Sequence, residues 1–376
     1  SEDLTQRTFR YFWDTTDTER CLAPDRWPSR TFSSIAATGF ALTAYGIGAE
    51  RGYVSRAEAA SRTRDCLAFY WNAPQGSEES GVTGHKGFFY HFLKYDDGTR
   101  HATTELSTVD TTLFLGGALF AQSYFDRDDP VEAEVRDLAE KIYRRVEWDW
   151  AQRNTTGTQA INLDNSHGIA MGWKPEEGWG KSDWIGYNEG MLVYVLALAS
   201  PTHPVGKDAW DKGWAADLEK DWGTYYGYEH LQFEPLFGHQ YSHVWIDFRG
   251  IQDEFMRGKG IDYFENSRRA TLSQQAYGAD NPHDWKDYSG DIWGWTASDG
   301  PKYSKDEYSV NGQSRTFFTY MARGVSANWA PKCPRCATRF KCRAPTISIG
   351  PEFPTRMDCP SVRCTAGTTF TTRETA

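Results

Sequence analysis

The acid with the clearest chemical potential in this chain is Glu189, in the run Gly-Tyr-Asn-Glu-Gly at 186–190. An apolar segment over 191–199 follows it and predicts a buried helix. A carboxylate there is costly unless it is paired, hydrogen-bonded or protonated. Trp179 and Trp184 lie just before it, and a lone acid beside stacking aromatic rings is typical of sites that cleave sugars. The alternative is a structural acid bonded to neighbouring backbone.

Glycosidic cleavage commonly needs a second carboxyl group that activates water or attacks the anomeric carbon, while the first donates a proton to the leaving oxygen. Burial among aromatic rings would raise the pKa of Glu189 and suit it to proton donation. Glu105 is the second candidate, although the N-terminal dipole of the helix that follows would also favour an acid there. For Asp110, a capping or core hydrogen-bonding role is an equally good interpretation. A carboxyl separation of about 5–5.5 Å would suit retention, and about 6.5–9.5 Å inversion.

A dense polar and aromatic block lies over residues 239–249. His239 and His243 are four residues apart and would share one face of a helix. No Glu follows His239 directly, so the block lacks the HExxH zinc arrangement. We expect contacts with sugar hydroxyls or a structural polar network here, and neither a metal nor a cofactor.

The elements that would position these residues are mainly helices. Apolar residues recur at helical spacing over 33–47, 55–71, 107–125, 130–146 and 187–199. Mostly apolar segments alternate with amphipathic ones, as in an inner ring of helices enclosed by an outer ring. The sequence therefore predicts an all-α toroid, and a two-layer helical array is the alternative. A strand-like patch over 88–93 suits short hairpins at one end of the ring.

The composition of the chain limits which classes of molecule it is expected to bind. The 376-residue chain carries a formal net charge of −10, which argues against nucleic acid and anionic membranes. With 16 Trp, 20 Tyr and 21 Phe it holds more aromatic residues than a core of this size needs. No apolar run approaches the roughly 20 residues that span a bilayer. The chain begins at Ser1 without a signal region, as would a mature secreted form, a fragment or an incomplete gene product. We expect a monomer that is periplasmic or secreted.

Composition changes near residue 325. Residues 326–376 contain eight Lys or Arg against three Asp or Glu, and five of the seven cysteines. Cys333 and Cys336 could form half of a zinc knuckle, but no second CxxC or His pair follows. We therefore expect a catalytic domain over 1–325 and an atypical basic tail over 326–376. Disulfides in the tail, disorder and a shifted reading frame are the alternatives.

Several stretches, in this order along the chain, resemble glycoamylase-like domain proteins. They are Thr38–Leu42, Gly87–Phe92, Glu105–Thr111, Gly186–Glu189, Ser200–Pro204, His239–Arg249, Asp262–Thr271 and Thr296–Pro301. That family includes bacterial endo-β-1,2-glucanases of glycoside hydrolase family 144 and the transglycosylating domains of cyclic β-1,2-glucan synthases. The resemblance covers residues 9–324 and implies an (α/α)6 barrel in which short β-hairpins and loops form a glycan-binding cleft.

The resemblance also implies a function: hydrolysis of β-1,2-glucan or sophoro-oligosaccharides, with inversion, by Glu189 as general acid and Glu105 as its partner. The expected sugar-binding residues are polar or aromatic positions of the same motifs and of the loops beside them. They are Asp25, Arg26, Trp27, Phe89, His91, Asp110, Trp179, Tyr187, Gln240, Tyr241, Asp247, Arg249, Arg268, Trp293, Trp295 and Asp299.

Two alternatives stay open. A transglycosylase of the same fold would rearrange β-1,2-glucan without net hydrolysis. A catalytically impaired glycan-binding protein is the other, because relatives continue with further helices where this chain has its cysteine-rich tail. An α-glucan substrate is a minor third possibility.

Overall fold

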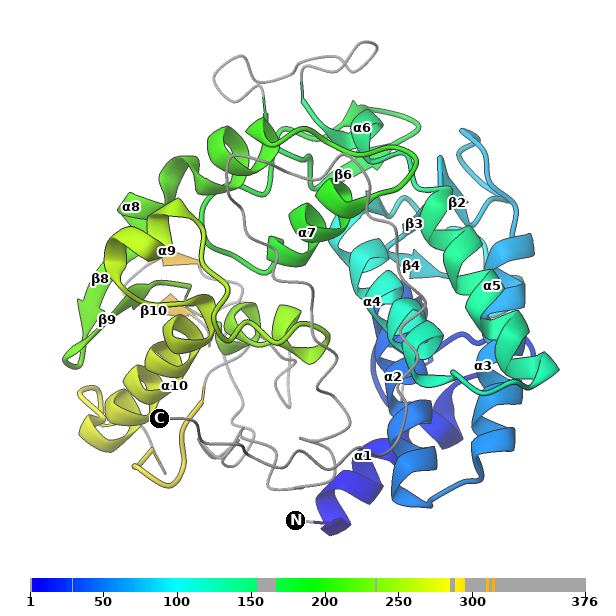
Figure 1. Cartoon of the computed structure of the whole chain (residues 1–376), viewed down its shortest axis with the longest axis horizontal. Helices are drawn as coiled ribbons and strands as arrows, with labels where there is room; N and C mark the ends of the chain where they lie inside the picture. Colours follow the sequence, from blue (N-terminus) through cyan, green and yellow to red (C-terminus); the bar gives the residue numbers. More distant parts are fainter. Residues whose placement is uncertain are drawn as a thin grey trace, which may run out of the picture.

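The computed structural model describes residues 2–28, 30–153, 167–233, 235–284 and 288–294, together with the backbone of 309–310 and 313–314. Its elements trace an arc in which helices predominate (Figure 1). The α-helices are α1 (Glu2–Thr15), α2 (Ile35–Arg51), α3 (Arg56–Asn72), α4 (Thr108–Tyr124), α5 (Pro130–Arg144), α6 (Trp148–Ala151), α7 (Met191–Ala199), α8 (Leu218–Asp221), α9 (Glu254–Lys259) and α10 (Tyr263–Asp280).

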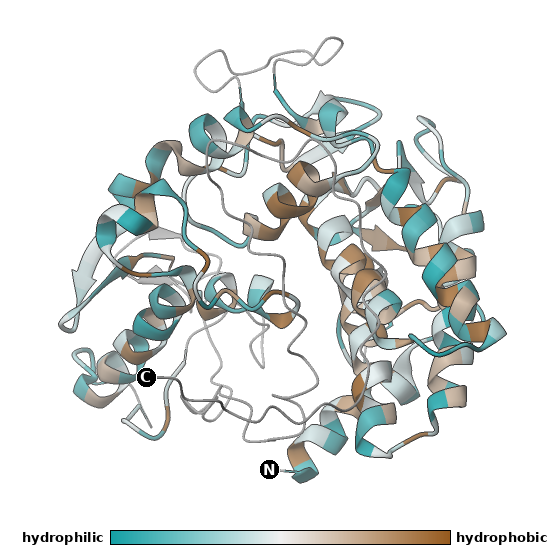
Figure 2. Ribbon diagram, in the orientation of Figure 1, coloured by the Kyte–Doolittle hydropathy of each residue, from teal (hydrophilic) through white to brown (hydrophobic). Residues whose placement is uncertain are grey.

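The helices of the first half form two layers. Helix α2 packs against α4, which also contacts α7, and these three lie on the inner side of the arc (Figure 1). Helices α3 and α5 pack on each other and cover α2 and α4 from outside. The inner helices α4 and α7 are the most apolar, whereas α5 has one polar face (Figure 2). This confirms a mostly helical fold; the closed barrel stays a prediction.

Local sequence explains where these helices begin. Ser34, Ser55 and Ser107 each accept a hydrogen bond from a backbone amide in the first turn of α2, α3 and α4. At α3 a capping box is complete, because the Glu58 carboxylate also accepts a hydrogen bond from the backbone amide of Ser55. Asp129 caps α5, whose first residue is Pro130.

Two glycines let the inner helices α2 and α4 approach closely. A Cβ on Gly39 would lie 2.2 Å from the carbonyl oxygen of Leu113, and one on Gly117 would lie 2.0 Å from the oxygen of Gly39. Backbone therefore packs on backbone, and no larger residue fits without moving the helices apart.

The strands form short antiparallel sheets. They are β1 (Ser33–Ser34), β2 (Gly84–His85), β3 (Phe88–Tyr90), β4 (Phe92–Leu93), β5 (Leu106–Ser107), β6 (Gly172–Lys174), β7 (Gly178–Trp179), β8 (Trp222–Tyr225), β9 (Tyr228–Leu231), β10 (Ser309–Val310) and β11 (Gln313–Ser314). The largest sheet has the order β2-β3-β5-β6-β7, and β1 pairs with β4. The strand-like patch over 88–93 therefore forms two strands.

A disulfide joins Cys21 to Cys66, with their Cα atoms 5.0 Å apart. It ties the loop after α1 to the middle of α3, which the sequence did not predict. No helix among the residues that the structure describes combines the length and the apolar character needed to cross a membrane.

Candidate active site

The five-stranded sheet brings the first two functional side chains together. Phe89 of β3 pairs with Ser107 of β5, and Tyr90 pairs with Leu106. The next pair in this register is His91 and Glu105, and the backbone amide of His91 donates to the Glu105 carbonyl at 2.9 Å. The side chains meet as well, because His91 Nδ1 lies 2.8 Å from Glu105 Oε1.

Helix α4 supplies an acid on the other side of the same imidazole. Asp110 stands in its first turn, and its Oδ1 lies 3.5 Å from His91 Nε2. The other carboxylate oxygen accepts a 2.5 Å hydrogen bond from Ser107, the residue that caps the helix. His91 therefore lies between two carboxylates, in an arrangement that we call the ion triple Glu105–His91–Asp110.

The members of the ion triple have pKa values shifted in different directions. Burial would lower the pKa of His91, but the charge of Asp110 and the bond to Glu105 outweigh it and raise this pKa to about 9. Burial would raise the pKa of Glu105, yet the bond to His91 and its charge hold that pKa below its usual value. For Asp110 the effect of burial exceeds the opposing effects of the His91 charge and the Ser107 hydrogen bond, so the pKa of Asp110 is raised.

Glu189 comes from a separate loop directly before α7. The carboxylate of Asp221 accepts a 2.7 Å bond from the backbone amide of Tyr187. The Asn188 side chain donates to the Ile185 and Gly186 carbonyls and accepts from the Gly190 amide at 2.8 Å. A side-chain clamp thus fixes the backbone on both sides of Glu189.

The carboxyl group of Glu189 faces the ion triple. Burial, and then the charge of Asp110, raise the pKa of Glu189 to about 7, and the positive charge of His91 opposes them. Among the described residues no hydrogen bond or ion pair fixes its carboxyl oxygens. The carboxyl group of Glu189 can therefore hold a proton near neutral pH, and it lies within electrostatic reach of His91 and Asp110.

Three inner helices begin at this point. The first amide of α2, on Ile35, donates to the His91 carbonyl at 3.2 Å. Asp110 lies in the first turn of α4, and Glu189 directly precedes the capping residue of α7. The site thus occupies the N-terminal end of the inner layer, beside the sheet (Figure 1).

Aromatic side chains border the acids. Tyr241 lies near enough to Glu189 and Asp110 for their charges to add to the burial that raises its pKa to about 12. The ring of Phe40 lies 5.3 Å from that of Tyr241 and 5.2 Å from that of Trp245. Gln240, predicted to bind sugar, is half-buried beside Tyr241.

Two expected sugar-binding aromatics have other surroundings. The register places Trp179 opposite Trp173, which is opposite Leu106, so Trp179 lies on the face of the sheet turned away from Glu105. There it packs on Trp150 with ring centroids 4.4 Å apart. Phe89 is fully buried against Tyr70 and Phe114. We therefore correct both assignments: these rings support the site and do not line it.

Tyr187 is also buried and belongs to a hydrogen-bonded network behind Glu189. Its hydroxyl lies 3.0 Å from His239 Nδ1 and 3.4 Å from Ser267 Oγ, which in turn lies 2.9 Å from His243 Nε2. His239 and His243 belong to separate 3-10 turns, Leu236–His239 and Ser242–Val244, not to one helix. A core polar network, one of the two predicted interpretations, describes this part of the block.

Four other predicted residues lie at the surface or in the core. Asp247 and Arg249 are exposed and form an ion pair of 2.9 Å. Arg268 is exposed and pairs with Glu265 at 2.7 Å, as the structural bridge that its position in α10 suggests. Trp293 is 2% exposed, so it presents almost no surface to a ligand.

The loop 25–27 approaches the ion triple from the N-terminal side. The charge of Asp25 acts on both His91 and Asp110, and its carboxylate pairs with Arg26 at 2.8 Å. Trp27 is 53% exposed, and the guanidinium of Arg30 lies over its ring at 5.1 Å from the centroid. Trp295, Asp299 and the cysteine-rich tail lie outside the described residues.

The sequence did not single out two residues that shape the site. The positive charge of Lys174, in β6, lowers the pKa of Glu105, and Asp221 anchors the loop that carries Glu189. The sequence does contain a pattern that places Lys174 on a strand. Trp173 and Trp179 flank a Pro-Glu-Glu-Gly turn, which is typical of a β-hairpin. Asp221 meets Tyr187 across 34 residues of chain, so no local pattern marks it.

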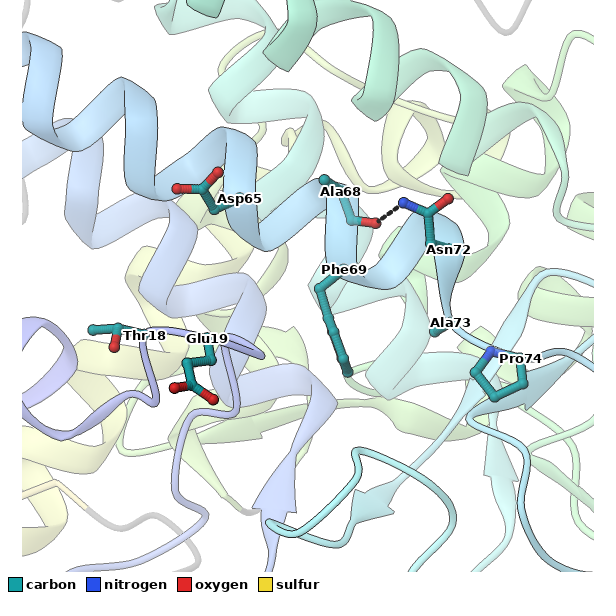
Figure 3. A pocket seen from close by; sticks show the side chains of 8 residues that line it. All are labelled: Thr18, Glu19, Asp65, Ala68, Phe69, Asn72, Ala73 and Pro74. Carbon is teal, nitrogen blue, oxygen red and sulfur yellow. Dashed lines mark hydrogen bonds between the residues drawn. The ribbon is translucent and has the colours of Figure 1, made fainter.

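A separate hollow of about 550 Å³ lies on the outer side of the molecule (Figure 3). Asp65, Phe69 and Asn72 of α3 line it together with Thr18 and Glu19. The amide of Asn72 is bonded to the Ala68 carbonyl, as the figure shows. This hollow has no link to the acids at the starts of α4 and α7, and we assign it no role.

Metal binding would require a suitable grouping of side chains among the described residues. Within the described ranges, no three His, Cys, Asp or Glu side chains are grouped so that they could hold a metal ion. His91 is held as a cation between its two carboxylates, whereas a metal-binding imidazole is neutral.

Comparison with known proteins shows which class of proteins this chain resembles. Residues 181–333 match the family model Glycoamylase, described as putative glucoamylase. A curated exo β-1,2-glucooligosaccharide sophorohydrolase (non-reducing end) of Parabacteroides distasonis is 28% identical over 331 residues. The match covers 79% of this chain but only 42% of that protein, so the chain spans less than half of its relative.

Solved structures agree with that class. A putative glucoamylase from Bacteroides uniformis is 29% identical with a TM-score of 0.69, over 80% of this chain and 70% of that one. An endo-β-1,2-glucanase from Chitinophaga pinensis, in complex with sophorotriose and glucose, is 25% identical with a TM-score of 0.65, over 80% and 71% of the two chains. The predicted resemblance to glycoamylase-like proteins is confirmed.

Proposed function

We propose that this chain is a glycoside hydrolase that cleaves β-1,2-linked glucan or sophoro-oligosaccharides. The observation that carries the proposal is the convergence of Glu189, a carboxyl with a pKa of about 7, on an ion triple that contains the ionised Glu105. One protonated and one ionised carboxyl are what general acid/base cleavage requires. Two of the named relatives, the sophorohydrolase and the endo-β-1,2-glucanase, are named for β-1,2-linked glucans, and this supports the substrate class.

In the proposed reaction Glu189 gives its proton to the glycosidic oxygen as the bond to the anomeric carbon breaks. Glu105 removes a proton from a water, whose oxygen attacks the same carbon from the opposite face, so the configuration inverts. Glu105 suits the base because its side chain is 39% exposed, whereas that of Asp110 is 13% exposed and bonded to Ser107. Exchange with solvent then restores both protonation states.

We further propose that the two helical layers belong to an (α/α)6 barrel and that the protein works in an oxidising compartment. The alternation of apolar and amphipathic helices and the likeness to the solved glucanase support the barrel. The Cys21–Cys66 disulfide supports periplasmic or secreted localisation, because such bonds are rare in the cytosol.

The test is incubation with linear β-1,2-glucan and, separately, with starch, followed by assay of reducing ends and chain length. New reducing ends from β-1,2-glucan only are expected, and NMR of the first product should show the α-anomer. Reducing sugar from starch only would reject the substrate. Rearranged oligomers without net hydrolysis would indicate a transglycosylase, and binding without turnover an impaired glycan-binding protein.

A further inference from the structure

We infer that His91 is a positioning residue: its imidazolium, held between Glu105 and Asp110, fixes the spacing of these two carboxyl groups beside Glu189. The sequence predicts a sugar contact for His91, and the positioning role is a separate assignment. The inference rests on the proposed function only where it concerns the reaction.

Each ring nitrogen of the His91 imidazole lies beside a carboxylate. One ring nitrogen lies 2.8 Å from Glu105 Oε1, and the other lies 3.5 Å from Asp110 Oδ1. Because each ring nitrogen has a carboxylate as its neighbour, a protonated ring is attracted to an acid on both sides. Phe92 stacks on it with ring centroids 3.8 Å apart, and the backbone of His91 bonds to Glu105 and Ile35.

The surrounding charges show why a cation is needed here. Asp25 of the N-terminal loop acts on His91 in addition to Glu105 and Asp110, and the charge of His91 acts in turn on Glu189. The nearby cations are Lys174, which acts on Glu105, and Arg26, which is paired with Asp25. Without His91, two like charges would share one site and one of them would take up a proton. The raised pKa of His91, about 9, agrees with this tight pairing.

The kinetic test compares His91→Gln, which removes the charge, with His91→Lys, which keeps one. For H91Q we expect kcat to fall about 100-fold, because a base misplaced by about 1 Å costs that much. We also expect both limbs of the pH profile of kcat/KM to move up by about one pH unit, since the acids nearby lose a cation. In H91K both limbs of the pH profile should lie close to their positions in the unsubstituted protein, because the cation is kept.

His85→Gln is the matched control. His85 is a half-buried histidine in β2 of the same sheet and stacks on Trp173, away from Glu105. It should lower stability without moving either limb. A loss of kcat in H91Q with both limbs unmoved would make His91 merely structural and overturn the inference.

An independent readout needs no substrate. In the full chain labelled at histidine, NMR should show His91 titrating above pH 8, with its signal assigned through H91Q. Glu105→Gln should lower that midpoint by about one pH unit or more. A midpoint near 6.5 in the unsubstituted protein would overturn the inference even if the glucanase is active. A high midpoint in a protein inert towards β-1,2-glucan would support the ion triple and reject the proposed function.

Discussion

Proton affinity at individual side chains decides which acid can do which part of the chemistry. Glu189 lacks a fixed partner among the described residues and lies in a buried position, so its proton is held near neutral pH. Glu105 is bonded to a cation and stays ionised. In the proposed reaction, the different environments of the two carboxyl groups, rather than their identity, assign one as the acid and the other as the base.

Glu189→Gln should lower kcat about 100- to 10,000-fold, because it removes the proton donor while keeping the shape of the side chain. In the unsubstituted protein, activity should fall as the pH rises through about 7, since Glu189 must be protonated to act. The measurement is kcat/KM on β-1,2-glucan between pH 4 and pH 9. Glu134→Gln, at an exposed acid of α5, is the control and should match the unsubstituted protein. Equal loss in both variants would contradict the assignment.

A second residue-scale prediction concerns stability in acid. Burial lowers the pKa of His239 to about 3 and that of His243 to about 4, against 6.5 for an unburied histidine. Below pH 6.5 these histidines bind protons in the unfolded chain but stay neutral in the folded chain. The free energy of unfolding therefore falls as the pH decreases. For His239 the loss between pH 7 and pH 5 should be about 2 kcal/mol.

Urea unfolding at the two pH values measures this loss, and His239→Gln should reduce the difference by about 2 kcal/mol. The comparison between variants isolates the histidine from other titrating groups. Parallel pH dependence in the two proteins would show that His239 is protonated in the fold or already hydrogen-bonded as a cation.

At the scale of elements, the helices with strong local signals could be predicted from the sequence. The expected segments 55–71 and 107–125 are α3 and α4 within two residues, because serine caps and apolar spacing mark them. The predicted helix over 187–199 begins later, at Met191, since the Asn188 side chain bonds to the backbone just before it. Four-residue spacing of His239 and His243 did not produce a helix; the chain forms two short turns there.

The site was predictable in part, for the same physical reason. Glu105 and Glu189 could be chosen from their neighbours in the sequence, and they do gather around one histidine. Which face of a sheet Trp179 occupies depends on the register of strands far apart in the chain, and no local pattern reveals it. The same holds for Asp221, whose role arises from a contact made only in the folded chain.

The close packing of α2 on α4 gives a prediction at this scale. Gly117→Ala should destabilise the fold by about 1–3 kcal/mol or more, because the added Cβ would lie 2.0 Å from the Gly39 oxygen. The matched control is Gly258→Ala in α9, where no atom lies within 4 Å of the added group. There we expect no loss, or a gain of up to about 1 kcal/mol. Thermal unfolding of both variants is the measurement, and equal stability would contradict the close approach.

For the whole molecule, the disulfide between Cys21 and Cys66 is the main covalent constraint in the described residues. It closes a loop with a sequence separation of 45, which includes Asp25 near the ion triple and all of α2. By loop entropy, such a cross-link stabilises the fold by about 4 kcal/mol. The constraint therefore links the stability of the inner layer to the position of a loop at the site.

Replacing both cysteines by serine should lower the free energy of unfolding by about 4 kcal/mol, since the unfolded chain regains its freedom. Urea unfolding of the variant and of the unsubstituted protein measures the difference without any reductant. An unchanged midpoint would show that the two cysteines are not joined in the protein as isolated.

The same bond has a consequence for a protein exposed to proteases. Arg26 and Arg30 are exposed and lie inside the loop that the bond closes. A single tryptic cut at either position would leave the two fragments covalently attached, so the nicked protein would keep its mass until a thiol released the N-terminal piece.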